Sequence, residues 1–216
     1  MSLRNVLVVL YDGMQSLDVT GPVETFAALD HFGGRSGYRI RTVSPGGTPV
    51  RTHSGLTLVP DGDPEGARPA PGTTLPVPGG RYTADFEPRL TDWLRAHGSG
   101  AERLVAVCTG ALLLAAAGLL DGRRAASHRM FLDRLPAFGA EPTGERVVFD
   151  GKYVTAAGVS SGIDMGLALL GRIAGDEVAQ TVQLMTEYDP RPPSDAGSPD
   201  KAPADLVARL RAVSPP

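Results

Sequence analysis

Cysteine is nearly absent from this sequence of 216 residues, which contains only Cys108. A single cysteine excludes an internal disulfide and any metal site built from a cluster of thiolates, and it suits a reducing compartment. Basic residues are not in excess either, because the formal net charge is −3. Nothing in the composition therefore indicates a general attraction to nucleic acid or to an anionic membrane surface.

Long hydrophobic runs are also missing. The apolar run near the N-terminus covers residues 6–10, and the longest other stretch, 111–120, is interrupted by Gly118. Both are too short for a membrane span, and the first is too short for the core of a signal peptide. We therefore expect a cytoplasmic protein with no membrane partner.

Several motifs that bind cofactors are lacking as well. No Gly-x-Gly-x-x-Gly follows a β-prone run, no Gly-Lys-Ser/Thr phosphate loop occurs, and the four histidines show no metal-ligand spacing. We expect neither a cofactor nor a metal ion. Spacing alone leaves a Ser-His-Asp arrangement open.

What the sequence does contain is an alternation of β-prone and helix-prone segments. The first half predicts strands at 6–10, 38–43, 73–80 and 104–107, helices at 23–29, 86–97 and 111–117, and a short hairpin at 50–52 and 56–59. Pro76 is awkward in a central strand because it has no N–H to donate. The alternation predicts one α/β domain over residues 1–216 with a mostly parallel sheet.

The second half continues with a short strand at 124–126. We expect Ser127 to cap the helix that follows at 130–135, and Pro136 to end it. Asp150-Gly151 predicts the two-residue turn of a hairpin over 147–155. The remaining segments are helices at 163–173 and 177–188, an irregular Pro-rich segment at 189–203 and a C-terminal helix at 204–213.

The single cysteine lies where an apolar run meets a helix-prone stretch. Residues 105–107 lead into Cys108, and Thr109-Gly110 precede the stretch 111–117. We interpret this as strand, tight turn and helix, with Cys108 in a cramped backbone conformation at the helix N-terminus. The helix dipole and the unpaired N–H groups there favour the thiolate, the reactive form of the side chain. The alternative is a small buried core residue, as free cysteines often are.

Two further features belong at the same edge of such a sheet. Asp18 is expected in the loop after the first strand, with Pro22 in the first turn of the next helix and Thr20 or Gly21 as its cap. The strand at 73–80 ends in Gly79 and Gly80. Sites in open α/β sheets form beyond the carboxyl ends of the strands, so a nucleophile, a proton carrier and backbone donors would meet there. Taken alone, Asp18 could cap a turn and the glycines could turn the chain.

Five stretches together resemble the ThiJ/PfpI superfamily, which has the class I glutamine-amidotransferase-like fold. They are DVTGP at 18–22, VPGG at 77–80, VCTGA at 107–111, GLLDGRRA at 118–125 and TAAGVSSGID at 155–164. Within the superfamily the chain most resembles the isocyanide (isonitrile) hydratases, whose branch the segment QLMTEYDP at 183–190 also matches. The resemblance covers nearly the whole chain.

The resemblance implies a flavodoxin-like three-layer sandwich with helices on both faces of the sheet, a nucleophile elbow and a homodimer. It implies that Cys108 is the nucleophile, that Asp18 contacts its thiol and that Thr109 orients the reacting group. His128 matches a histidine of the hydratase and regulator branches, in which a tryptophan commonly follows; this sequence has Arg129 there. The candidate substrate- and oxyanion-binding residues are Gly79, Gly80, His128, Gly158 and Ser160, although Ser160 and Ser161 could simply cap a helix.

Two other activities of the superfamily fit less well. Many peptidase-like members have a histidine directly after the cysteine, where this sequence has Thr109. Regulators of the superfamily join the same kind of domain to a DNA-binding helix-turn-helix pair, for which the sequence up to Pro216 leaves no room. We therefore expect an enzyme acting on a small molecule, with no nucleic-acid partner.

The reaction that the resemblance favours is hydration of an isocyanide to an N-formamide. Cys108 would attack the terminal carbon while protonated Asp18 supplies a proton, and Asp18 would then deprotonate the water that attacks the thioimidate. Asp18 would need a raised pKa, which burial beside the thiol could give. Three alternatives stay open: a glyoxalase-like or other tailoring reaction on another small molecule, an oxidation sensor built on Cys108, and a ligand-binding domain without catalysis.

Overall fold

Six strands form the central sheet of the computed structural model, which describes residues 4–32, 38–81 and 88–213. Their order is β2-β1-β5-β6-β10-β9, with bounds β1 Arg4–Val9, β2 Tyr38–Val43, β5 Thr73–Val77, β6 Arg103–Val107, β9 Val147–Asp150 and β10 Tyr153–Ala156. Neighbouring strands from β2 to β10 are parallel, and β9 is antiparallel to β10 at the edge. The prediction of a mostly parallel sheet is confirmed.

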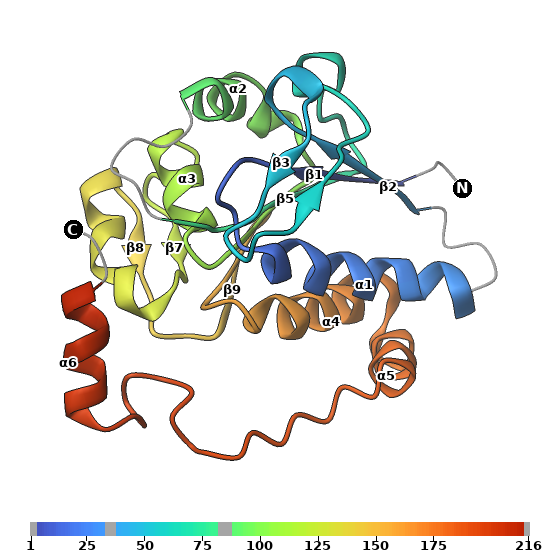
Figure 1. Ribbon diagram of the computed structural model, residues 1–216. Helices are drawn as coiled ribbons and strands as arrows, with labels where there is room; N and C mark the ends of the chain where they lie inside the picture. The colour runs from blue at the N-terminus through green and yellow to red at the C-terminus, as the bar shows by residue number, and fades with distance from the viewer. Residues whose placement is uncertain (1–3, 33–37, 82–87, 214–216) are drawn as a thin grey trace.

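Helices cover both faces of this sheet (Figure 1). On one face lie α1 (Ser16–Phe32) and α4 (Ser161–Ala174), with α5 (Asp176–Met185) against them. On the other lie α2 (Pro88–His97) and α3 (Gly110–Ala116). Each helical layer closes its own hydrophobic core on the sheet. This is the flavodoxin-like three-layer sandwich that the resemblance implies.

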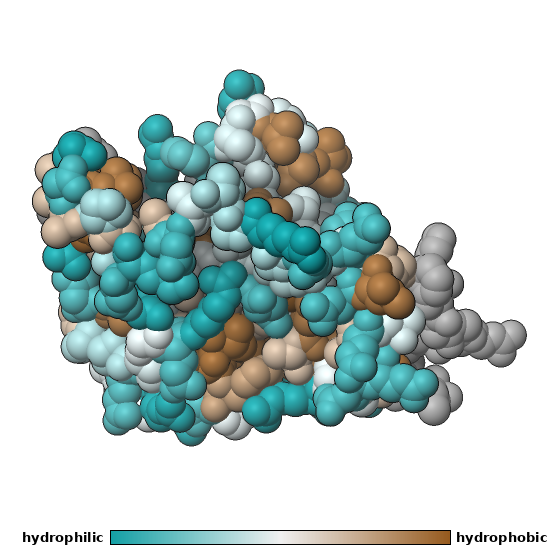
Figure 2. Space-filling model, turned by 90° about the horizontal axis from the view of Figure 1, so that it is seen from below, coloured by the Kyte–Doolittle hydropathy of each residue, from teal (hydrophilic) through white to brown (hydrophobic). Residues whose placement is uncertain are grey.

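The remaining elements are short. They are the strands β3 Val50–Arg51, β4 Thr57–Leu58, β7 Arg124–Ala125 and β8 Glu141–Pro142, the 3-10 helices η1 Pro45–Gly47, η2 Pro64–Gly66, η3 Gly98–Gly100 and η4 Arg129–Phe138, and the helix α6 Ala204–Val213. Residues 189–203, which we call the C-terminal arm, run irregularly from α5 to α6 along the underside of the molecule (Figure 1). Seen from below, the surface is mostly hydrophilic, with separate hydrophobic patches (Figure 2).

Strand β1 shows why a continuous apolar run predicts a strand in the middle of the sheet. Val6 and Val8 belong to the core under α1 and α4, whereas Leu7 and Val9 belong to the core under α2 and α3. Side chains alternate between the two faces of a strand, so burial on both faces requires apolar residues throughout. Pro76 lies in β5 beyond Thr74, the last residue paired with β1.

Helix α1 begins earlier than its sequence predicts. The helix starts at Ser16, so Asp18 lies in its first turn and not in a loop, and neither Thr20 nor Gly21 is a cap. Pro22 lies inside the helix, where a proline normally weakens the hydrogen-bond ladder. Tertiary packing overrides this preference: a Cβ atom at Gly21 would lie 3.1 Å from Ile163 Cγ1, because α1 and α4 pack closely there.

The segment after β7 also differs from its prediction. It is a 3-10 helix that continues through Pro136 to Phe138, and its cap is the His128 ring, not Ser127. The predicted helix at 86–97 is described from Pro88 onward, and residues 86 and 87 lie outside the described residues. In the described part of the chain, no helix has the length and apolar character needed to cross a membrane.

Gly110 allows α3 to begin directly against the end of β5. A Cβ atom at this position would lie 2.2 Å from the Val77 carbonyl oxygen, a backbone atom that has little freedom to move aside. We expect Gly110→Ala to lower the free energy of unfolding by about 1–3 kcal/mol, measured by urea denaturation. Gly197→Ala is the matched control, because a Cβ atom there meets nothing within 4 Å. Equal stability of the two variants would contradict the close approach.

Candidate active site

Cys108 joins β6 to α3 in a strained turn. Its φ of 59° is in the left-handed region, which non-glycine residues rarely occupy. Hydrogen bonds hold the backbone on both sides: the Cys108 N–H donates to the carbonyl oxygens of Ala156 (3.1 Å) and Ala157 (2.8 Å), and the Cys108 carbonyl accepts from Ser127 Oγ (3.0 Å). The prediction of a cramped conformation at a strand–helix turn is confirmed.

The Cys108 sulfur is almost completely buried. The residue is 6% exposed, and its thiol accepts hydrogen bonds from the backbone N–H groups of Thr109 and Val159. Burial first, and then the negative charge of Asp18, raise the pKa of the thiol to about 12, while the two N–H groups oppose the rise. The prediction that this position favours the thiolate is wrong for the free protein, because burial outweighs the donors at the start of α3.

Asp18 is the acidic partner of this thiol. The first turn of α1 places its carboxyl group at 1% exposure, where Oδ2 accepts the Gly79 N–H at 2.9 Å. Oδ1 makes no regular hydrogen bond with the described residues, and the Cys108 thiol is the polar side chain that interacts with the carboxyl group. Burial raises the Asp18 pKa to about 7, while the bonds from Gly79 and Cys108 oppose the rise. Near neutral pH, Asp18 can therefore both hold and release a proton.

The turn after β5 uses its polar groups to position these side chains. The Gly79 N–H donates to Asp18 and its carbonyl accepts from the Gln15 N–H at 2.7 Å. Thr109 Oγ1 accepts the Gly80 N–H at 3.0 Å and donates to the Gly80 carbonyl at 3.1 Å. We expected the N–H groups of Gly79 and Gly80 to be free donors for a ligand. This expectation is wrong, because Asp18 accepts the Gly79 N–H and Thr109 accepts the Gly80 N–H. The N–H groups that face the sulfur belong to Thr109 and Val159.

Close packing explains the pair of glycines in this turn. A Cβ atom at Gly79 would lie 2.5 Å from the Thr109 nitrogen, and one at Gly80 would lie 2.7 Å from the Gly13 carbonyl oxygen. Larger residues would push the turn away from the elbow. The two glycines thus act through the approach of the backbone rather than as anion donors.

A cavity of about 670 Å³ lies beside the elbow. Its wall on the domain side includes Leu17, His128, Arg146 and residues 157–160, and its opposite wall is built by the C-terminal arm and α6, including Pro192, Leu206 and Val207. Leu17 precedes Asp18, and Val159 carries the N–H that faces Cys108 Sγ. The cavity therefore reaches residues that directly flank the two candidate catalytic side chains.

His128 lines this cavity in a fixed orientation. Its Nδ1 accepts the Met130 N–H at 3.3 Å, so the neutral ring carries its proton on Nε2, and burial lowers its pKa. A Cβ atom at Gly158 would lie 3.0 Å from His128 Cδ2, so that glycine allows the ring to approach residue 159. His128 and Gly158 are thus brought together beside the cavity, as candidates for contact with a ligand.

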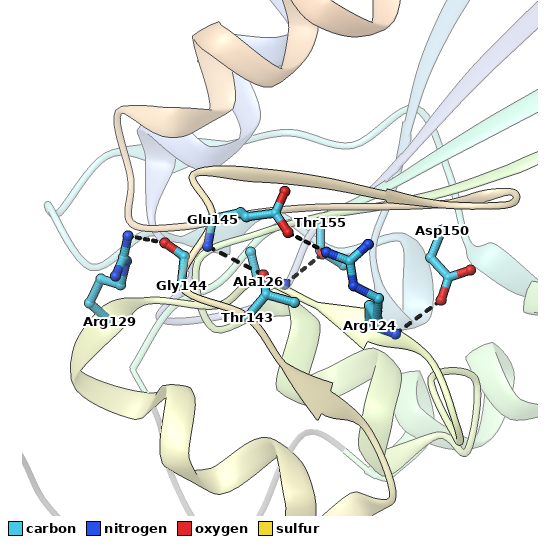
Figure 3. Close-up of polar contacts among 8 residues, drawn as sticks. All are labelled: Arg124, Ala126, Arg129, Thr143, Gly144, Glu145, Asp150 and Thr155. Carbon is cyan, nitrogen blue, oxygen red and sulfur yellow. Dashed lines mark hydrogen bonds and ion pairs between the residues drawn. The ribbon is translucent and has the colours of Figure 1, made fainter.

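Polar contacts around β7 fix the segment that carries His128 (Figure 3). The Ala126 N–H donates to Thr155 Oγ1 on β10 at 2.8 Å, and the Arg124 N–H donates to Asp150 Oδ2 at 3.0 Å. Arg129, which replaces the expected tryptophan, points its guanidinium to the Gly144 carbonyl and lies 3.6 Å from Asp200. Arg129 therefore links this segment to the C-terminal arm.

A family model described as the DJ-1/PfpI family matches residues 4–172. The chain belongs to the DJ-1/PfpI family. It is 38% identical over 208 residues to the isonitrile hydratase of Pseudomonas putida. This alignment covers 94% of this chain and 88% of the hydratase. It is also 30% identical to the HTH-type transcriptional regulator GbdR of Pseudomonas aeruginosa, over 86% of this chain and 51% of the regulator.

A solved structure supports the same family relationship. The crystal structure of a ThiJ/PfpI family protein from Pseudomonas syringae superposes on this chain with a TM-score of 0.89 at 36% sequence identity. The match covers 99% of this chain and 86% of that chain. The fold described above therefore matches that of a family relative along nearly its whole length.

The surroundings of Ser160 in this DJ-1/PfpI protein are not those of a serine nucleophile. Residues 158–162 read Gly-Val-Ser-Ser-Gly, which matches the Gly-x-Ser-x-Gly pattern of serine hydrolases. Ser160 is nevertheless exposed, has φ −67° and ψ −19°, and accepts a hydrogen bond from Arg146 Nη2 at 3.2 Å. Ser160 occupies the N-cap position of α4, but its side chain makes no capping hydrogen bond. Ser161 is the first residue of α4, and its Oγ is buried with no hydrogen bond to the described residues. Cys108 therefore remains the candidate nucleophile.

Sequence reasoning missed three contributors to the site. They are the Val159 N–H at the sulfur, the Tyr11 hydroxyl that donates to the Pro78 carbonyl at 2.9 Å, and the C-terminal arm that closes the cavity. A backbone donor leaves no signal in its own side chain, and Tyr11 reads only as the end of a strand. In the described part of this DJ-1/PfpI protein, no group of three or more His, Cys, Asp or Glu side chains is arranged to hold a metal ion.

The raised Asp18 pKa has a measurable effect on stability. Between about pH 5 and pH 7 the folded protein retains a proton on Asp18 that the unfolded chain releases, so stability falls as the pH rises. Asn at this position still accepts the Gly79 N–H but does not ionise. We expect the wild type to lose about 2 kcal/mol relative to Asp18→Asn between pH 5 and pH 8, measured by urea denaturation.

The exposed Asp205 of α6 supplies the control for this measurement. Its side chain forms an ion pair with Arg209 on the surface, so Asp205→Asn should follow the pH dependence of the wild type. Parallel stability curves for Asp18→Asn and the wild type would mean that Asp18 is ionised in the folded protein throughout this range.

Proposed function

We propose that this DJ-1/PfpI protein hydrates an isocyanide to an N-formamide, with Cys108 as nucleophile and Asp18 as general acid and base. The observation that carries the proposal is the buried pair itself: a strained cysteine beside a carboxyl group with a pKa of about 7. The 38% identity to the isonitrile hydratase of Pseudomonas putida supports the choice of substrate class.

The first step forms a covalent intermediate. As Sγ attacks the terminal carbon of R–N≡C, ionised Asp18 accepts the thiol proton and then delivers it to the same carbon. The S–H bond is replaced by S–C and C–H bonds, and the product is the thioimidate R–N=CH–S–Cys108. Because the resting thiol is neutral, this step depends on a base within contact of it, and Asp18 is placed for that role.

The second step releases the product. Asp18 takes a proton from water as the oxygen attacks the thioimidate carbon, and the nitrogen gains a proton to give R–NH–CH(OH)–S–Cys108. Loss of the hydroxyl proton and cleavage of the C–S bond yield R–NH–CHO, and the departing sulfur takes up a proton. The thiol and Asp18 return to their initial states, so water is the sole co-reactant.

The shape and polarity of the site suit this chemistry. The N–H groups of Thr109 and Val159 stabilise the negative charge that the sulfur carries while it attacks and while it leaves. An isocyanide ends in a slender linear group, which can reach a sulfur that is only 6% exposed. The cavity would hold the rest of the molecule, and His128 Nε2–H would donate to the nitrogen or oxygen of the reacting group.

A ligand-binding role without turnover is the second candidate. The similarity to the regulator GbdR over 86% of this chain favours it. A glyoxalase-like reaction and a redox sensor also use a reactive cysteine, and they remain distinct alternatives. The homodimer, the small-molecule substrate and the cytoplasmic location stay predictions from the sequence.

Loss of the sulfur separates these candidates. We expect the wild type to convert an aryl isocyanide to the N-formamide, followed by chromatography, and Cys108→Ala to lose at least about 10³-fold in kcat because no covalent intermediate can form. Asp18→Asn should lose about 10²–10⁴-fold. Circular dichroism of each variant checks that its fold is unchanged.

Several outcomes would reject the proposal. Undiminished turnover in Cys108→Ala would remove the covalent mechanism. Conversion of methylglyoxal without conversion of the isocyanide would favour the glyoxalase-like alternative. Stoichiometric binding with no product would favour the ligand-binding role.

A further inference from the structure

Tyr11 lies close enough to Asp18 and Cys108 to feel their charges, and it takes no part in the chemistry proposed above. It follows β1, its ring packs against the hydrophobic cores on both sides of the sheet, and its hydroxyl donates to the Pro78 carbonyl at 2.9 Å. A Cβ atom at Gly80 would lie 3.1 Å from this hydroxyl. Tyr11 is therefore in direct contact with the turn that holds Asp18.

The Pro78 carbonyl and the Gly79 N–H belong to one peptide unit. That unit is planar, and with no cis peptide bond in the described chain its C=O and N–H point in opposite directions. Tyr11 binds the C=O end at 2.9 Å, and Asp18 Oδ2 binds the N–H end at 2.9 Å. Fixing the carbonyl thus fixes the direction of the N–H, and a hydrogen bond to the carbonyl also strengthens the N–H as a donor.

We propose that Tyr11 is a positioning residue, whose hydroxyl orients the Pro78–Gly79 peptide so that its N–H is held against the Asp18 carboxylate. Other contacts do not replace this one. Gln15 binds the Gly79 carbonyl and Thr109 binds the Gly80 N–H, both on the next peptide unit along the chain. Thr109 also binds the Gly80 carbonyl, which lies one unit further on. Within the part of the chain that the structure describes, the Tyr11 contact alone acts on the peptide plane that carries the donor to Asp18.

Few ionisable groups face Asp18 among the described residues. Cys108 interacts with its carboxyl group directly, and Tyr11 feels the negative charge of both. Acidic residues on the neighbouring elements have other partners: Asp12 accepts the Arg51 N–H at 2.7 Å, and Asp164 on α4 binds Arg146 and Tyr188. Arg51 and His53 of the nearby hairpin are exposed, and His128 lies at the cavity wall. Burial is the largest influence on the Asp18 pKa, and the Gly79 N–H is the larger of the two contacts that favour the ionised form.

The test uses Tyr11→Phe in the full chain, which keeps the ring and removes the hydroxyl. The titration midpoint of Asp18 is followed by carboxyl ¹³C NMR, with the Asp18 signal assigned through Asp18→Asn. Because the N–H stabilises the ionised form, its misalignment should raise the midpoint by about half to one pH unit. Tyr153→Phe, a tyrosine of β10 at the far side of β6, should leave the midpoint unchanged.

The catalytic consequence rests on the proposed function and is measured separately. If Asp18 acts as the base, the acidic limb of kcat against pH for the aryl isocyanide should move upward with the NMR midpoint in Tyr11→Phe. A shifted midpoint without isocyanide turnover in the wild type would refute the proposed function and leave the role of Tyr11 supported. An unchanged Asp18 midpoint in folded Tyr11→Phe, even with lower thermal stability, would show that the hydroxyl is merely structural and would overturn the inference.

Discussion

The buried contact between Asp18 and the turn after β5 is the constraint around which this edge of the molecule is arranged. The carboxyl group comes from the first turn of α1, on one face of the sheet, and its donor comes from the chain that leaves β5. A carboxyl group at 1% exposure requires polar contacts, because an unpartnered charge in such a place is strongly unfavourable. The Gly79 N–H meets only part of this requirement, since it binds Oδ2 and leaves Oδ1 without a regular hydrogen bond to the described residues, and the Cys108 thiol interacts with the same carboxyl group.

Close backbone approach makes this contact feasible. Gly79 and Gly110 let the turn after β5, the elbow and the start of α3 touch without intervening side chains. The positive φ of Cys108 is held by hydrogen bonds to β10 and to Ser127, so the strain is maintained by the surrounding fold and not by the residue itself. The elbow is thus a product of tertiary packing as much as of its own sequence.

Burial sets the protonation of the site. It raises the pKa of both acids, so the resting pair is a neutral thiol beside a carboxyl group that is half ionised near neutral pH. This arrangement differs from a thiolate activated by a helix N-terminus, which the position before α3 had suggested. In the proposed reaction the proton moves with the attack of the sulfur, and a thiolate need not accumulate beforehand.

The sequence alone determined the α/β class, the parallel sheet, the strained position of Cys108 and the placement of Asp18 at the same sheet edge, while the contact of Asp18 with the thiol came from the resemblance to the superfamily. Continuous apolar strands, helix-prone segments and the glycines at strand ends are local signals, and they survive in the folded chain. Only the tertiary structure decided that α1 begins at Ser16 through Pro22, that Gly79 and Gly80 serve Asp18 and Thr109, and that Tyr11 and Val159 join the site. These features depend on which backbone groups meet across the sheet edge and on how deeply they are buried, and residues distant in the sequence carry no local mark of either.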